Sequence, residues 1–141
     1  MKLAPIVCLG LATLVTLSCS SAPVKIEAGD QCYRCRRSIN NERVAGAAVY
    51  GPQFVAKFRG PGCMAKYLVS HPEEKPVLFV TDYTSGKMIA PERAFYVSEV
   101  VDRNTGETDY RAYSQQTDAA AFAAETHATP IAWNAVLEQA R

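Results

Sequence analysis

The order of apolar segments and turn residues constrains the fold of this chain more than any other sequence feature. Residues 44–50 and 54–58 are rich in β-prone side chains, and the Gly-Pro pair between them predicts a tight reversal, so these segments should form a β-hairpin. Residues 61–70 are predicted to be a helix, because a proline suits the first helical position. Residues 77–81 follow as a short buried strand. The first half therefore has the order strand, strand, helix, strand.

The same order recurs in the second half. Residues 94–101 and 108–114 are predicted strands around a turn at Asn104-Thr105-Gly106, residues 118–127 a helix and residues 129–133 a strand. This internal repeat depends on element order and spacing, not on residue identity. It predicts an α+β fold with two small ββαβ units, each a three-stranded antiparallel sheet packed on one helix.

The N-terminus has the layout of an export signal. Lys2 precedes an almost wholly apolar run from Leu3 to Leu17, and small residues follow, so residues 1–18 are predicted to be a signal peptide. Cys19, directly after the cut, indicates a bacterial lipoprotein in which this residue carries the lipid. An ordinary cleaved signal with an incidental cysteine is the alternative. The run is shorter than the roughly 20 residues that cross a bilayer.

The remaining chain is predicted to divide into a lipidated tether and the two units. Residues 19–31 form the tether, residues 32–84 the first unit with a cysteine cluster, and residues 85–141 the second unit. The chain has 15 basic and 14 acidic residues, and one basic residue leaves with the signal, so the mature chain has no net formal charge. This balance argues against nucleic acid as a partner, which needs a concentrated positive field.

Sulfur-bearing residues carry the predicted chemistry. Cys32 and Cys35 are separated by two residues, and Cys63-Met64 opens the first predicted helix. Thiolates and thioethers are the ligands that Cu(I) prefers, so these four residues are the predicted metal ligands. Cys63 should lie in the first helical turn, where the helix dipole favours a thiolate. Met64 has core packing as its alternative, because it belongs to an apolar stripe at helical spacing.

Two further interpretations of the cysteines stay open. In an oxidising compartment Cys32 and Cys35 can form a disulfide, which describes a structural or partner-binding lipoprotein without metal. They can also form the reversible couple of a thiol-disulfide oxidoreductase. Such motifs normally open a helix after a strand, and residues 36–41 lack helical periodicity. No phosphate loop or hydrolytic motif is present, so we expect no enzyme activity.

The chain resembles the NosL-type lipoproteins, accessory proteins of nitrous oxide reductase that handle copper outside the cytoplasm. The likeness extends from about Asp30 onward and rests on the following residues: Cys32 and Cys35 soon after a lipoprotein signal, Phe58, Gly62-Cys63-Met64, Tyr67-Leu68, Val80-Thr81-Asp82-Tyr83-Thr84, Ala94-Phe95-Tyr96-Val97 and the segment 119–133. The resemblance implies a lipid-anchored Cu(I) chaperone of two ββαβ units at the extracytoplasmic face of the bacterial envelope. Its implied partners are the membrane and an exported copper enzyme or copper transporter.

Two positions depart from the family pattern. Arg36-Arg37 stand where copper-handling members usually have Gly-Met, and residues 104–107 lack a methionine expected near the second hairpin. Cations replace soft ligands at the first position and repel a bound metal ion. Zinc, or no metal at all, therefore stays as an alternative to Cu(I).

Overall fold

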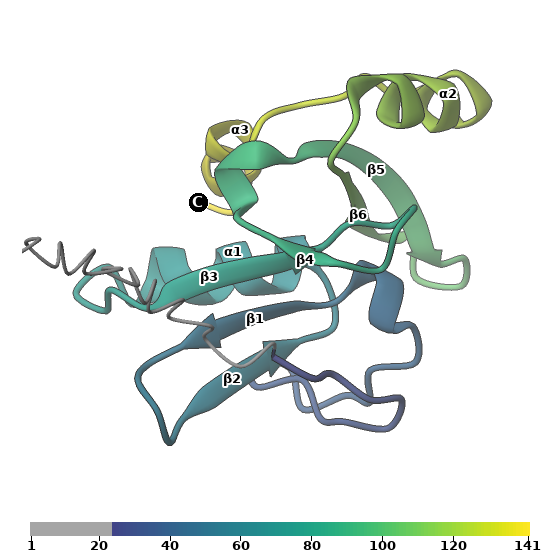
Figure 1. The fold of residues 1–141 in the computed structure, drawn as a ribbon. Coiled ribbons are helices and arrows are strands. Elements are labelled where there is room, and N and C mark those ends of the chain that lie inside the picture. Colours follow the sequence, from purple (N-terminus) through teal and green to yellow (C-terminus); the bar gives the residue numbers. More distant parts are fainter. Residues whose placement is uncertain (1–23) are drawn as a thin grey trace, which may run out of the picture.

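A computed structural model describes residues 24–141 of the chain (Figure 1). Its helices and antiparallel sheets confirm the α+β class. The predicted signal peptide and the predicted lipidation site Cys19 lie outside the described residues. Among the residues described, none of the helices has the length and apolar character needed to span a bilayer.

The first sheet has four antiparallel strands in the order β2-β1-β3-β4. Its strands are β1 (Gly46–Val49), β2 (Val55–Phe58), β3 (Val77–Thr81) and β4 (Met88–Ile89), and a 3-10 turn, η1 (Glu42–Val44), precedes them. The predicted hairpin is β1-β2, and Gly51 in its turn has a φ of 129°, which a side chain would oppose. The predicted helix is α1 (Pro61–Ser70), which lies against β1 and β2 (Figure 1).

The second sheet has two strands, β5 (Phe95–Asp102) and β6 (Glu107–Tyr113), after the short turn η2 (Pro91–Arg93). The turn between them contains Gly106, whose φ of 70° is left-handed. The helix α2 (Gln116–Thr126) packs on both strands. These three elements match the predicted order.

The segment predicted as the last strand, residues 129–133, forms only one bridge. Ile131 exchanges backbone hydrogen bonds of 2.8 and 2.9 Å with Tyr96, and Trp133 then begins a third helix, α3 (Trp133–Gln139). Pro130 has no backbone N–H to extend the pairing. Trp133, Val136 and Leu137 follow helical spacing, and this signal was missed because the apolar residues before it resemble a strand.

The main core draws residues from both halves of the chain. Phe58 and Met64 of the first half are fully buried in one cluster with Tyr96, and Trp133 and Val136 of α3 complete it. Strand β4 lies after residue 85 in sequence and pairs with β3 of the first half. The division of the chain at residues 84 and 85 stays a prediction.

A buried carboxylate joins the second sheet to α1. Asp109 of β6 is 7% exposed, and its Oδ1 accepts a 2.7 Å hydrogen bond from the backbone N–H of Gly62 in the first turn of α1. A side chain at Gly60 would overlap the Asp109 carboxylate, and one at Gly62 would place Cβ 2.9 Å from Oδ1. Both glycines are therefore required by the close approach of this side chain.

We expect Gly60→Ala to lower the free energy of unfolding by about 2 kcal/mol, since the new methyl group must displace a short, buried side chain. Urea denaturation measures this change. In an Asp109→Ala background the same substitution should cost much less, because the overlapping carboxylate is gone. If Gly60→Ala lowered the free energy of unfolding equally in the two backgrounds, overlap with Asp109 would not be the reason why residue 60 must be glycine.

Candidate metal centre

A short loop carries Cys32 and Cys35 along the edge of the first sheet. The Cys32 N–H donates to the Arg37 carbonyl at 2.8 Å, and the Arg36 N–H donates to the Cys32 carbonyl at 2.9 Å, which closes the loop on itself. The Tyr33 N–H donates to the Lys57 carbonyl of β2 at 2.7 Å. These bonds fix the loop against β2, the strand that leads through Phe58 to α1.

The structure brings the three predicted cysteine ligands together. The Sγ atoms of Cys32, Cys35 and Cys63 all lie within 4.8 Å of one another, and those of Cys32 and Cys63 are 3.4 Å apart. Two sulfurs that share an ion at about 2.3 Å lie roughly 4 Å apart, so this spacing is compatible with one shared metal. Cys32 and Cys63 are buried and Cys35 is half-buried.

The contact between Cys32 and Cys63 separates their acidities. The hydrogen bond with Cys63 lowers the pKa of Cys32, and backbone N–H groups act in the same direction. The hydrogen bond with Cys32 raises the pKa of Cys63, and burial adds to the rise. The contact therefore favours a thiolate on Cys32 and a proton on Cys63 over two thiolates.

Cys63 lies in the first turn of α1, as predicted, but the contact with Cys32 and burial raise the pKa of its thiol, against the expected preference for a thiolate. The Gly62 N–H at the start of α1 donates to Asp109 at 2.7 Å, and the backbone of Cys63 also lowers the pKa of that carboxyl group. Burial raises the pKa of Asp109, and these bonds work against the rise. The helix end therefore stabilises a neighbouring carboxylate more than its own thiol.

Arginines surround the sulfur atoms. The Arg34 side chain opposes the rise in the pKa of the Cys63 thiol. Arg59, which follows β2, lies in electrostatic range of Cys35 and Asp109 and pairs with Glu107. Arg37 pairs with the same glutamate at 2.7 Å. Of these arginines, Arg34 and Arg59 therefore act on sulfur atoms of the site, and Arg37 and Arg59 are held by Glu107.

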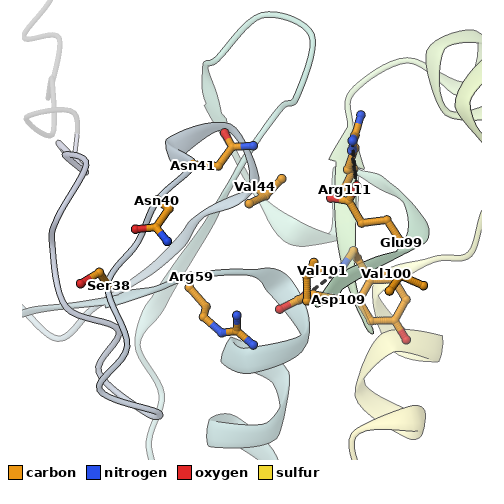
Figure 2. A pocket seen from close by; sticks show the side chains of 11 residues that line it. Ser38, Asn40, Asn41, Val44, Arg59, Glu99, Val100, Val101, Asp109 and Arg111 are labelled. Carbon is orange, nitrogen blue, oxygen red and sulfur yellow. Dashed lines mark hydrogen bonds and ion pairs between the residues drawn. The ribbon is translucent and has the colours of Figure 1, made fainter. Parts of the chain in front are cut away.

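Arg59 and Asp109 also line an open pocket of about 320 Å³ between the β5-β6 sheet and residues 38–44 (Figure 2). Figure 2 shows Glu99 and Arg111 on the far side of this pocket, where they form an ion pair of 2.7 Å. The lining, within the part of the chain described, includes none of the three cysteines. Arg59, which lines the pocket, also lies in electrostatic range of Cys35, so the pocket is near the sulfur site.

Met64 is fully buried in the main core. Its Sδ would lie 3.3 Å from a Cβ built at Gly46, so the thioether packs against the backbone of β1. This contact agrees with the alternative that Met64 is a core residue. A role of Met64 as a ligand stays a prediction.

Arg36 has a φ of 63°, in the left-handed region that glycine adopts most easily. Glycine is the residue that the resemblance leads us to expect at this position, and the backbone has the conformation that suits glycine. The Arg36 guanidinium lies 5.2 Å from the centre of the Tyr33 ring, a cation–π contact that offsets part of the strain.

Sequence reasoning found the cysteines and missed the residues that position them. Asp109, Glu107 and Arg59 lie far from Cys32 in sequence and belong to no motif. The alternating glycines at 60 and 62 are the one local signal, since they indicate a close approach by another group. They do not identify that group as Asp109.

Comparison with known proteins agrees with the geometry. A family model described as NosL matches residues 23–140, which is most of the chain. No curated protein and no solved structure matches.

Mild oxidation of the metal-free chain should join Cys32 to Cys63 before it joins Cys32 to Cys35, because the first two sulfurs are already in contact. Oxidised glutathione, followed by proteolysis and mass spectrometry, identifies the bridge. Cys35→Ser should still form it, and Cys63→Ser should not. A bridge that forms only between Cys32 and Cys35 would contradict this geometry.

The lowered pKa of Cys32 predicts that this residue is a thiolate at neutral pH. As pH falls, absorbance at 240 nm should persist below the usual cysteine range and then disappear when Cys32 becomes protonated, since its pKa is lowered. The difference from a Cys32→Ser chain isolates this step. Cys63→Ala removes the donor, so it should move the step to higher pH. An unmoved step would show that the hydrogen bond from Cys63 is not what lowers the pKa of Cys32.

Proposed function

We propose, from the premise that this chain belongs to the NosL family, that it binds Cu(I) through Cys32, Cys35 and Cys63 and passes the ion to an exported copper protein. Family membership points to a copper-related bacterial lipoprotein and so to the cell envelope. The single observation that carries the metal role is the clustering of three thiol sulfurs within 4.8 Å.

Charge and donor number favour Cu(I) over zinc. Three thiolates around Cu(I) carry a net charge of −2 and around Zn²⁺ a net charge of −1, so the nearby Arg34 and Arg59 stabilise the copper form more strongly. Structural zinc sites usually have four protein ligands. In residues 24–141 no histidine or carboxylate joins the three cysteines.

We also propose the remaining envelope features. Residues 1–18 direct export, Cys19 carries the lipid, and residues 20–31 tether the folded part to the membrane. The client is an exported copper enzyme or a copper transporter. No step in this role requires catalysis, because transfer between sulfur ligands changes neither the charge nor the oxidation state of the ion.

Titration of the reduced chain with Cu(I), in the absence of oxygen and against a competing chelator, tests the proposal. We expect about one Cu(I) per chain. Cys35→Ser and Cys63→Ser should each weaken binding by about 3 kcal/mol, roughly a hundredfold, since a hydroxyl replaces a soft ligand.

Met64→Leu is the matched control, because it keeps the buried volume and removes only the thioether. Unchanged affinity would leave the cysteines as the whole site, and a loss like that of the cysteine variants would add Met64 as a ligand. Undiminished copper binding in both cysteine variants would reject the proposed site. Stronger binding of Zn²⁺ would reject copper as its cargo.

A further inference from the structure

The sulfur site is accessible from one side. Cys32 and Cys63 are buried, whereas Cys35 is half-buried and its chain neighbours Arg34 and Arg36 are exposed. A ligand that takes over the metal must therefore approach through Cys35. The surface around this thiol determines which molecules can do so.

An aromatic strip borders this opening. Arg36 lies over the Tyr33 ring, and the edge of Tyr33 meets the ring of Phe54, with 5.5 Å between ring centres. Phe54 is 45% exposed, and Tyr50 packs beside it with ring centres 5.3 Å apart. We call this border of the opening the rim surface, and it consists of Arg34, Arg36, Tyr33 and Phe54. It combines cations with an exposed aromatic ring, a composition typical of interaction sites.

No acidic side chain in the described residues forms an ion pair with the two arginines of the rim surface. Glu107 pairs with Arg37 and Arg59, and Asp30 pairs with Lys57. Neither Arg34 nor Arg36 takes part in an ion pair in residues 24–141. Two cations beside the exchange point attract a partner of opposite charge.

We propose that the rim surface docks an acidic protein segment that presents a methionine or cysteine sulfur to Cys35. This inference rests on the proposed copper role. The partner's thioether forms a bond to Cu(I) as the bond from Cys35 to Cu(I) breaks, and no electron moves. With a cysteine partner, the proton of its thiol passes to the released Cys35 thiolate. A lipid headgroup offers no soft ligand, so a protein fits this surface better than an anionic membrane does.

The test uses the Cu(I)-loaded chain and synthetic peptides of equal length with one methionine at the same position. One peptide surrounds it with Asp and Glu, and the other with Asn and Gln. We expect the acidic peptide to remove copper on the order of tenfold faster at low salt, and this advantage should disappear at high salt. Stopped-flow measurement of copper transfer gives both rates.

Variants at Arg36 separate charge from shape, because Asn and Asp both tolerate the left-handed backbone there. Arg36→Asn should reduce the advantage of the acidic peptide, and Arg36→Asp should reverse it. Arg93→Asp is the matched control, because Arg93 is exposed in η2, which follows β4 at the opposite edge of the sheet from the cysteine loop. It should leave the rates unchanged.

Each outcome decides the proposal. A chain that binds no Cu(I) would overturn the proposed function and the docking surface with it. A chain that binds Cu(I) and transfers it at the same rate to both peptides would overturn the docking surface alone. Arg36-dependent binding to phosphatidylglycerol vesicles, without any preference between the peptides, would assign the rim surface to lipid and overturn the protein partner.

Discussion

The contact between Asp109 and the first turn of α1 holds the sulfur site in register with the rest of the molecule. A carboxylate buried this deeply is costly unless it is hydrogen-bonded, and the Gly62 N–H at 2.7 Å with the Tyr110 N–H at 2.8 Å satisfies it. The contact needs two glycines on one side and a correctly placed strand on the other. Through it, the second sheet fixes the position of Cys63.

The arginines change the interpretation of the site as a whole. In the sequence, cations in place of soft ligands argue against a metal. In the structure Arg36 lies over the Tyr33 ring and Arg37 pairs with Glu107. The arginines that act on the sulfur atoms are Arg34 and Arg59. The cations that stand in place of the soft ligands are therefore engaged by Tyr33 and Glu107, and the predicted site consists of cysteine sulfurs. The backbone of Arg36 is in the left-handed region, a conformation that glycine adopts most easily.

Local signals predicted most of the fold and half of the site. The hairpin β1-β2, the helix α1 and the pair β5-β6 follow from periodicity and turn residues, and Pro61 placed Cys63 in the first helical turn. The helix α3 was missed because Ile131 and the residues near it have the same apolar character in a strand or a helix. The role of Asp109 could not be predicted from the sequence, for a different reason. Its role depends on packing between elements far apart in sequence, which no spacing rule encodes.

The complete burial of Cys32 has a consequence for the lifetime of the protein in the cell. This thiol belongs to the same core cluster as Phe58 and Trp133, so a cargo bound there cross-links the loop, α1 and the interior. Ligands that bind only the native state reduce the population of opened molecules that proteases can attack. Under the proposed copper role, empty molecules should be degraded faster than loaded ones, and the abundance of the protein would follow the copper supply without any change in gene expression.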